Sequence, residues 1–447
     1  MKSLKIKGGK PLSGKIHIQG SKNAVLPILA ASLLGEGPVV IENCPVIGDV
    51  KDTLQIMEKL GCIICRKEEF VCVDASLADG FVIEKEQASR IRSSVLFLGA
   101  LLGKIKKAVL PWPGGCAIGE RPIDLHLEAL RELGAIIEEY RQPGREQGEK
   151  NAGVLRADGK RMHGAAIQLR FPSVGATENI ILAAVTLPGE TIVEHAAREP
   201  EVDQLCEFLS LRGADIKREA DTIRIRGGAV LKPICYRMQA DRIVTGTYLL
   251  ATAASRGAIT ILNFPNGLDA LLLLLKKMGG EIQTKDQSLT FIMQRRACAA
   301  GFVETAPYPG FPTDLQSPLM AVLAGADGSS VLKENLFENR FKTAEELIRM
   351  GAQITVNGNC AGITGCDRLH GSRVKASDLR GGAALAIAAL QASGITTVTG
   401  LEYVERGYED IARDFRLLGA QAWVEQEKER RPDIRSAENM EDEKRRE

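Results

Sequence analysis

The segment PWPGGCAIGERPIDLH, residues 111–126, holds a thiol whose surroundings suit chemistry. Cys116 lies between two small residues, and Arg121 follows five positions later. A nearby cation lowers the pKa of a thiol and makes it reactive. Long loops rich in glycine and proline often close over a site. The sequence therefore predicts a catalytic lid loop at 111–122 that carries a reactive Cys116, with an incidental surface thiol as the alternative.

Basic residues stand where four apolar helices are expected to begin. They are Lys22, Arg92, Arg242 and Arg380. A cation at a helix N-terminus opposes the helix dipole, at a cost of about 0.3–1 kcal/mol. If these helix starts converge on a cleft, the cations and the helix N–H groups would bind an anion. A solvated side chain at each position is the alternative.

Three aspartates near helix starts have two possible roles. Asp241, Asp314 and Asp378 stand where a carboxylate can cap the first turn of a helix. Capping explains Asp241 and Asp378 at least as well as a functional role does. The residues alone leave the choice open for all three.

Two further loops could bind an anion. FPSVGATEN precedes a buried helix and offers Ser173 together with the backbone N–H groups of Val174 and Gly175. This arrangement can cradle a diphosphate without a Walker lysine. VERGYED places Arg406 just before the last surface helix, where a plain helix-start loop is the alternative.

The elements that position these residues follow from an internal repeat. A helical pattern that ends in glycine recurs six times, at Gly61, Gly134, Gly213, Gly279, Gly351 and Gly419. Glycine just past the last turn is the usual end of a helix. A more apolar helix, which should be buried, precedes each one. These buried helices are expected near 23–34, 93–103, 176–187, 243–254, 314–324 and 381–392.

Runs rich in β-formers, such as GPVVIEN and GITTVTG, follow most of the buried helices. The chain is therefore an α/β protein of six units, each of ~70 residues, arranged as two domains of three units. The sixth unit is expected to lack its final strand, because charged residues follow Trp423, and residues 1–21 are expected to close the C-terminal half instead. We expect one domain at 22–240, a second made of 1–21 and 241–424, and a charged, disordered tail at 425–447.

Composition narrows the possible functions. Lys plus Arg is 58 and Asp plus Glu is 57, so a global basic field for nucleic acid is absent. No window approaches the ~18 apolar residues of a membrane span, and the N-terminus lacks the apolar core of a signal peptide, which predicts a cytoplasmic protein. Cys62 and Cys65 form a lone CxxC, but no second pair completes a zinc set and the histidines show no ligand spacing. No GxGxxG motif stands between a strand and a helix, so neither a metal nor another cofactor is expected.

Together these motifs resemble those of the UDP-N-acetylglucosamine 1-carboxyvinyltransferases, also called UDP-N-acetylglucosamine enolpyruvyl transferases, of the enolpyruvyl transferase family. The resemblance covers residues 1–424. Its markers, in order, are GSKNAVLPILAASLL, PGGCAIGERPIDLH, FPSVGATEN, AAREPEVD, DRIVTGTYL, FPTDLQ, ENLFENRF, DLRGGAAL and ERGYED. The resemblance implies an inside-out α/β barrel of two domains, each with three repeated units, in agreement with the repeat count.

The resemblance also implies a reaction. Phosphoenolpyruvate would donate its enolpyruvyl group to the 3-hydroxyl of UDP-N-acetylglucosamine and release phosphate, the first committed step of peptidoglycan synthesis. Addition and elimination through a tetrahedral intermediate need a general acid and a base, but no metal. By the motif match, Cys116 is the acid and the residue that fosfomycin alkylates in similar enzymes. Asp314 would be the base, and Lys22 and Arg406 would act on the donor.

The binding residues implied by the motif match contact either substrate. They are Lys22, Asn23, Arg92, Arg121, Pro122, Ile123, Asp124, Leu125, Ser173, Val174, Gly175, Asp314, Leu336, Arg340, Arg380 and Arg406. Lys22, Arg121 and Arg406 would hold the phosphate and carboxylate of phosphoenolpyruvate. The sequence departs from the pattern at Phe171 and Pro172, where some relatives place a basic residue near the uracil.

Three other functions compete with this one. A 5-enolpyruvylshikimate-3-phosphate synthase would share the fold and the donor, but it lacks the lid cysteine. A non-catalytic paralogue would bind UDP-N-acetylglucosamine and regulate, but it would not need Cys116, Asp314 and Lys22. A repeat-built interaction protein would not need reactive groups at the helix starts of different units.

Overall fold

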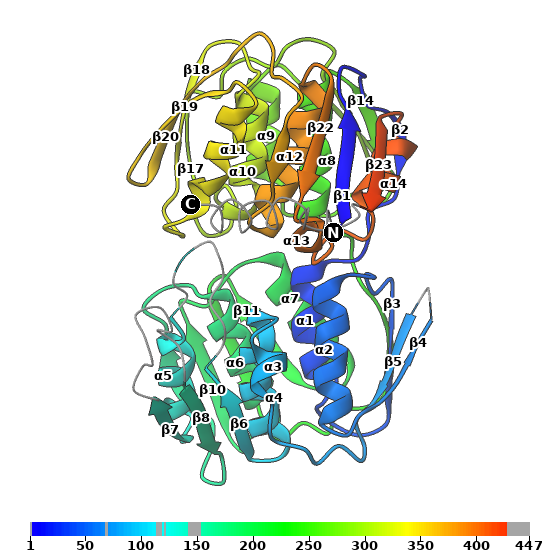
Figure 1. Ribbon diagram of the computed structural model, residues 1–447. Helices are drawn as coiled ribbons and strands as arrows, with labels where there is room; N and C mark the ends of the chain where they lie inside the picture. The colour runs from blue at the N-terminus through cyan, green and yellow to red at the C-terminus, as the bar shows by residue number, and fades with distance from the viewer. Residues whose placement is uncertain (1, 68–69, 113–118, 120–121, 142–152, 427–447) are drawn as a thin grey trace, which may run out of the picture.

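The computed structural model describes residues 2–67, 70–112, 119, 122–141 and 153–426. Two lobes lie one above the other, and each has its own hydrophobic core (Figure 1). The first core runs from Ala24 to Met238. The second combines Leu4–Ile18 with Ala240–Ala422.

In the lobe built on the first core, three sheets surround buried helices. The sheet orders are β13-β3-β5-β4, β6-β8-β7 and β11-β12-β10-β9. The strands are β3 (Pro38–Glu42), β4 (Ile63–Arg66), β5 (Phe70–Asp74), β6 (Lys107–Pro111), β7 (Ile136–Arg141), β8 (Gly153–Asp158), β9 (Ala166–Gln168), β10 (Glu190–Glu194), β11 (Asp215–Glu219), β12 (Thr222–Arg226) and β13 (Ile234–Arg237). The helices are α1 (Lys22–Ala31), α2 (Gly48–Lys59), α3 (Lys85–Ala88), the 3-10 helix η1 (Arg92–Val95), α4 (Leu96–Lys104), α5 (Asp124–Glu132), α6 (Val174–Ala184) and α7 (Pro200–Leu211).

The other lobe repeats this plan. Its sheet orders are β15-β16-β14-β2, β17-β18-β20-β19 and β21-β22-β1-β23. The strands are β1 (Lys2–Lys7), β2 (Ser13–Ile16), β14 (Ala258–Ile261), β15 (Glu281–Lys285), β16 (Ser288–Ile292), β17 (Phe302–Glu304), β18 (Ser329–Lys333), β19 (Gln353–Asn357), β20 (Cys360–Thr364), β21 (Arg373–Lys375), β22 (Ile395–Thr399) and β23 (Gln421–Gln426). The helices are α8 (Arg242–Ser255), α9 (Asp269–Lys277), η2 (Thr313–Leu315), α10 (Gln316–Leu323), η3 (Arg340–Lys342), α11 (Thr343–Arg349), α12 (Leu379–Gln391), α13 (Leu401–Val404) and α14 (Ile411–Leu417).

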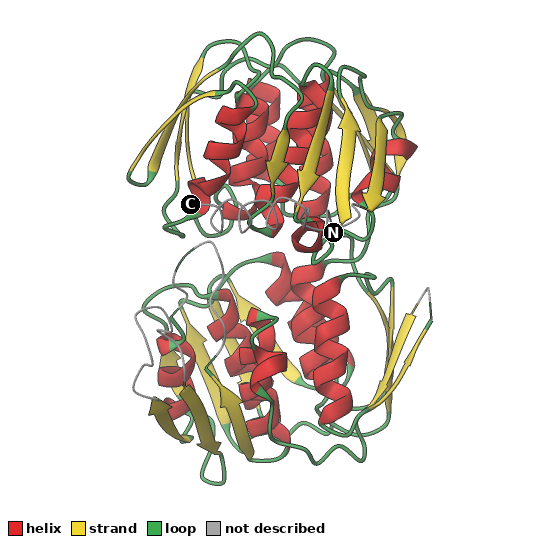
Figure 2. Ribbon diagram, viewed as in Figure 1, coloured by secondary structure: helices red, strands yellow, loops and turns green. Residues whose placement is uncertain are grey.

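The inside-out α/β barrel expected from the sequence is confirmed. Helices fill the middle of each lobe and sheets cover them (Figure 2). The six buried helices are α1, α4, α6, α8, α10 and α12, each within a few residues of its expected range. All six repeat glycines follow a helix and have positive φ, from 88° at Gly419 to 111° at Gly213. A residue with a Cβ is strained there, which explains why glycine marks the repeat.

The chain passes from one lobe to the other twice, between β2 and α1 and between β13 and α8. The strand before each crossing pairs with a strand from the opposite half of the sequence. β13 completes the first sheet by pairing with β3, whereas β2 pairs with β14 of the other lobe. The crossings lie side by side, because Gly20 bridges Ala240 and Asp241 Oδ2 accepts a hydrogen bond from the Lys22 backbone N–H at 2.8 Å. The start of α1 is therefore fixed at the junction of the lobes.

The expectation that the sixth unit lacks its final strand is confirmed, because the N-terminal β1 holds the place in β21-β22-β1-β23 that β20, the final strand of its unit, holds in β17-β18-β20-β19. The strand before it, β23, nonetheless continues two residues into the charged tail expected from 425. β23 extends through Gln426 and pairs with β1, while β1 also pairs with β22. The charged side chains of β23 do not prevent a strand, because a ladder partner and an ion pair between Lys5 and Glu425 support it. The remainder of the charged tail, 427–447, lies outside the described residues.

Candidate active site

A cavity of about 850 Å³ lies between the two lobes. The first residues of the buried helices line it: Lys22 and Asn23 of α1, Arg92 and Ser93 of η1, Ser173, Val174 and Gly175 at α6, Arg242 of α8, Asp314 of η2 before α10, and Arg380 of α12. In each helix these ends carry N–H groups without an intrahelical partner, so they favour an anion. Six helix starts therefore face one space.

Most of the residues predicted to bind substrate line this cavity. Besides the helix starts they are Pro122, Asp124, Leu125, Leu336, Arg340 and Arg406. Ile123 does not line it; this residue is 1 % exposed and belongs to the first hydrophobic core. Cys116 and Arg121 lie outside the described residues.

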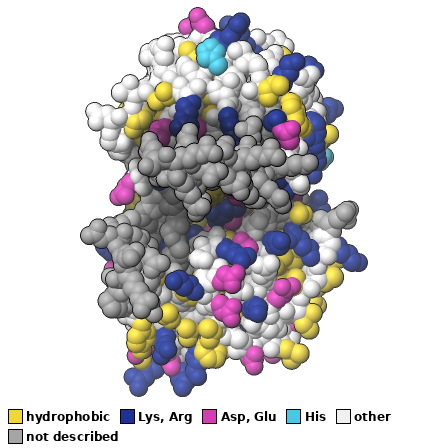
Figure 3. All heavy atoms as spheres, viewed as in Figure 1, with side chains coloured by type: hydrophobic (Ala, Val, Ile, Leu, Met, Phe, Trp, Pro, Cys, Tyr) yellow, Lys and Arg dark blue, Asp and Glu magenta, His cyan; other side chains and the backbone are white. Residues whose placement is uncertain are grey.

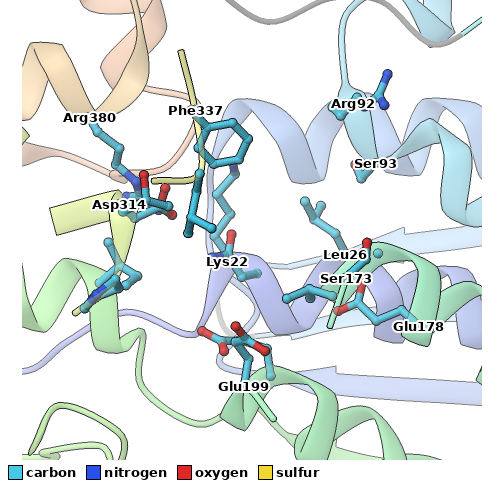
Figure 4. Close-up of a pocket in the computed structure, with 18 of the residues that line it drawn as sticks. Lys22, Leu26, Arg92, Ser93, Ser173, Glu178, Glu199, Asp314, Phe337 and Arg380 are labelled. Atoms are coloured by element: carbon cyan, nitrogen blue, oxygen red, sulfur yellow. The ribbon is translucent and has the colours of Figure 1, made fainter. Parts of the chain in front are cut away.

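Two buried arginines bind Asp314. Arg340 Nη2 donates to Asp314 Oδ1 at 2.6 Å, and Arg380 Nη2 donates to Oδ2 at 3.0 Å. Both arginine side chains are 3 % exposed, whereas Asp314 is 23 % exposed at the cavity wall. Figure 4 shows the Arg380 side chain directed at Asp314. The carboxylate raises the pKa of Arg380 despite burial, which alone would lower it, so Arg380 stays charged.

Asp314 is not a helix cap. It lies inside η2, and no side chain caps α10. Asp241 and Asp378, by contrast, do cap helices: Asp241 accepts from the N–H groups of Ile243 and Val244, and Asp378 from those at the start of α12. Of the three aspartates, Asp314 alone caps no helix and instead accepts hydrogen bonds from arginine side chains of two other segments.

Asp49, in the first turn of α2, joins two predicted donor ligands. Its Oδ2 lies 2.9 Å from Lys22 Nζ, and its Oδ1 accepts from Arg406 Nε at 2.7 Å. The Asp49 side chain is only 5 % exposed. Burial opposes its ionisation most strongly, but Lys22 and Arg406 together outweigh burial and lower the pKa of Asp49. The carboxylate therefore stays charged between two cations.

Arg242 has a different partner from the one that its position suggested. Its Nε and Nη2 donate to the two carboxylate oxygens of Glu201 at 2.9 and 3.2 Å, in a pair with both side chains buried. This bidentate pair joins α8 of one lobe to α7 of the other. The Arg242 charge is thus largely balanced by protein, and this residue is a poorer anion ligand than its place at a helix start indicated.

His126 presents an N–H group beside the start of α6. The Asn179 amide is oriented by two backbone contacts, since its Oδ1 accepts from Gly99 N–H and its Nδ2 donates to the Val95 carbonyl. Nδ2 also contacts His126 Nδ1 at 2.9 Å, so this ring nitrogen accepts and Nε2 carries the proton. Burial, followed by the nearby Arg92, lowers the pKa of His126 to about 3.

The neutral His126 ring packs against Gly175. A Cβ at position 175 would meet His126 Cε1 at 2.9 Å, so glycine permits this approach. The Ser173 side chain caps α6 by accepting from Ala176 N–H at 3.4 Å. The predicted cradle therefore gains His126 Nε2–H as a donor on its other side.

Glutamates line the wall that faces these cations. Glu178 of α6 is 4 % exposed, and its Oε1 has no hydrogen-bond partner among the described residues. Burial, then repulsion from Glu201 and Glu199, raises the pKa of Glu178 well above its usual range. Figure 4 places Glu178 and Glu199 across the cavity from Asp314. Burial therefore favours the protonated form of Glu178, which can donate a hydrogen bond.

In the described ranges, no group of three His, Cys, Asp or Glu side chains is arranged to hold a metal ion. Basic and acidic side chains are interspersed on the face that Figure 3 presents, rather than gathered into one basic field. The arrangement can bind a multiply anionic small molecule and can accept a proton at Asp314.

Sequence reasoning missed Asp49, His126, Glu178 and Glu201. Asp49 and Glu201 had an ordinary explanation, because carboxylates are common in the first turn of a helix. His126 stands inside the PIDLH motif, which was a usable signal. Glu178 stands inside FPSVGATEN, but only the fold shows that it is buried.

Comparisons with known proteins agree on one family. The family model described as EPSP synthase (3-phosphoshikimate 1-carboxyvinyltransferase) matches residues 6–415. The UDP-N-acetylglucosamine 1-carboxyvinyltransferase 2 of Caldanaerobacter subterraneus subsp. tengcongensis is 44% identical over 94% of this chain and 99% of its own length. UDP-N-acetylglucosamine 1-carboxyvinyltransferase 1 of Carboxydothermus hydrogenoformans is 41% identical over 94% of this chain and 98% of its own.

Solved structures agree with the fold. The enolpyruvyl transferase NikO of Streptomyces tendae superimposes with a TM-score of 0.81 at 25% identity, over 96% of this chain and 99% of its own. EPSP synthase of Acinetobacter baumannii gives 0.72 at 20% identity, over 95% of this chain and 100% of its own. Among the described residues, no helix is long and apolar enough to cross a membrane.

Proposed function

The chain belongs to the enolpyruvyl transferase family, and from this premise we propose that it transfers the enolpyruvyl group of phosphoenolpyruvate to the 3-hydroxyl of UDP-N-acetylglucosamine. Phosphate leaves, and the reaction opens peptidoglycan synthesis. The named relatives, at 41–44% identity over nearly the whole chain, support this acceptor rather than shikimate 3-phosphate.

The donor binds at Lys22 and Arg406. Phosphoenolpyruvate carries a phosphate and a carboxylate, and these two residues bring one cation from each lobe to the same wall of the cavity. The motif match adds Arg121. Cations fixed at a donor phosphate also stabilise the charge that this group carries away as it leaves.

The acceptor spans the cavity from α6 to Asp314. Its diphosphate lies at the Ser173–Gly175 helix start beside His126, where N–H groups converge. Pro122, Asp124 and Leu125 lie at the nucleotide end, and Asn23, Leu336 and Asp314 at the sugar end. In this pose the 3-hydroxyl faces the exposed edge of the Asp314 carboxylate.

The chemistry is an addition followed by an elimination. Asp314 accepts the hydroxyl proton as the sugar oxygen bonds to C2 of phosphoenolpyruvate, and Cys116 protonates C3. From the tetrahedral intermediate, C3 returns a proton to the Cys116 thiolate, the bond from C2 to the phosphate oxygen breaks, and inorganic phosphate departs. The role of Cys116 rests on the motif match, as does its alkylation by fosfomycin.

One observation carries the proposal: Asp314, the only one of the three candidate aspartates that does not cap a helix, faces the same cavity as Lys22 and Arg406. The test is phosphate release from phosphoenolpyruvate with UDP-N-acetylglucosamine or shikimate 3-phosphate as acceptor. We expect release with the first only. Release with shikimate 3-phosphate only, or with neither acceptor, would overturn the proposal. Location in the cytoplasm stays a prediction, and through peptidoglycan synthesis the protein would act in cell shape and division.

A further inference from the structure

Asp49 occupies an unusual position for a residue in the first turn of a helix. Its carboxylate does not point to solvent, and it does not cap α2, whose N-terminal residue Ile47 offers no side-chain cap either. Instead each oxygen bonds a cation from a different lobe, Lys22 on one side and Arg406 on the other. A helix-dipole role alone would not require burial to 5 % exposure between two charges.

The loop that carries Arg406 is attached to the same end of α2. The Gly48 N–H donates to the Glu405 carbonyl at 2.9 Å, and the Val46 N–H donates to Glu409 at 2.8 Å. Gln19, at the nearby chain crossing, makes two hydrogen bonds to this loop: its Nε2 donates to the Gly407 carbonyl, and its Oε1 accepts from the Glu409 N–H. Asp49 is thus the charged centre of a contact that joins the lobes beside the donor ligands.

Charge explains why a carboxylate belongs at this centre. Lys22 and Arg406 have long side chains, and without an anion between them the two positive charges repel each other. Asp49 has a short side chain on a rigid helix, so it can fix both cations with little loss of its own freedom. The ammonium and guanidinium groups have three and five N–H donors, so a bond to Asp49 does not exhaust either.

We propose that Asp49 is a positioning residue that assembles the donor site, by holding Lys22 of one lobe and Arg406 of the other at the separation that the donor anion requires. The inference rests on the proposed function for the identity of the donor. It adds that the donor site exists as a unit only while the lobes are in contact at α2.

The test compares three variants of the full chain. D49N keeps the size of the side chain and removes the charge, and D49E restores the charge. D52N is the matched control, because it removes the same charge from α2, three residues after Asp49. The ion-pair partner of Asp52 is Arg90, not Lys22 or Arg406. The measured quantities are KM for each substrate, kcat, and the dissociation constant of inorganic phosphate by calorimetry.

We expect D49N to raise KM for phosphoenolpyruvate at least tenfold over D52N, while KM for UDP-N-acetylglucosamine changes less than threefold. Phosphate binding should weaken in parallel, and D49E should recover part of both losses. A lower KM for the donor would mean that Asp49 competes with it, and an equal rise for both substrates would mean a merely structural role; either result overturns the inference, as does no difference from D52N.

The phosphate titration separates this inference from the proposed function. If the wild-type protein releases no phosphate with either acceptor, the proposed function fails on that result alone. Weaker phosphate binding by D49N than by D52N would still support the assembly of the anion site. Equal phosphate binding by the two variants would reject it.

Discussion

Replacing Asp314 by asparagine should damage both activity and stability, for reasons that can be measured separately. Loss of a general base typically costs 10²–10⁴-fold in rate, or about 2.7–5.4 kcal/mol of transition-state stabilisation. Removal of one partner from a buried ion pair costs about 3–5 kcal/mol, because the remaining charge is uncompensated. Asp314 is 23 % exposed, so we expect the lower end, about 3 kcal/mol, for the unfolding free energy.

The double variant D314N/R380Q separates the two losses. In D314N the charges of Arg340 and Arg380 lose their shared partner, and R380Q removes one of these two charges. Part of the lost unfolding free energy should therefore return, with a coupling energy of about 1–3 kcal/mol in a double-mutant cycle. Phosphate release should not rise above the D314N level, because no base has been restored. The assays are urea unfolding and initial rates at saturating substrates. A coupling below about 0.5 kcal/mol, or a D314N kcat within threefold of wild type, would refute the reasoning.

Three further outcomes are expected from single sites. The Cys116 thiol should be alkylated by fosfomycin, and C116A should resist; normal turnover after long exposure would contradict the motif match. Folded His126, with its pKa lowered to about 3, binds fewer protons than the unfolded chain below its ordinary pKa of ~6.5. Stability should therefore fall as pH drops through this window, and H126N should flatten that slope in pH-dependent urea melts while raising KM for the acceptor. Glu178, whose pKa is raised, stabilises the fold at low pH and loses this contribution as pH rises through its folded pKa. E178Q should resemble wild type at neutral pH and be relatively more stable in alkali, and an E178Q melt identical to wild type at every pH would count against a buried, protonated Glu178.

The repeat was predictable because it rests on local chemistry. A helix that ends at glycine needs a positive φ, and all six glycines have one. The buried helices were visible as apolar runs without a polar face. The end of the last strand was not visible, because β23 carries charged residues, and its stability comes from pairing with β1 at the other end of the chain.

Which residues form the site was partly predictable from the sequence, but their ion pairs and hydrogen bonds were not. Cations at helix starts stood out because they oppose the dipole. Their partners did not, because Asp49 and Glu201 occupy positions where a carboxylate is unremarkable in sequence. Contacts that span hundreds of residues, such as Arg406 with Asp49, depend on how the lobes meet. The protonation of Glu178 depends on burial, which a single helical turn does not reveal.

The ion pairs in the cleft explain how the protein tolerates several cations at helix starts. Cations at converging helix starts should repel one another and oppose each dipole. In the fold, a carboxylate from another segment accompanies them: Asp49 lies between Lys22 and Arg406, Asp314 between Arg340 and Arg380, and Glu201 pairs with Arg242. In the Asp49 group one carboxylate serves two cations, which leaves one net positive charge. Asp378 also lies 3.9 Å from Arg340, so the Asp314 group is balanced, as is the Arg242 pair. The unbalanced group lies where the donor anion is proposed to bind, so the excess positive charge is placed at the donor and the cations of the other two groups are balanced by protein carboxylates.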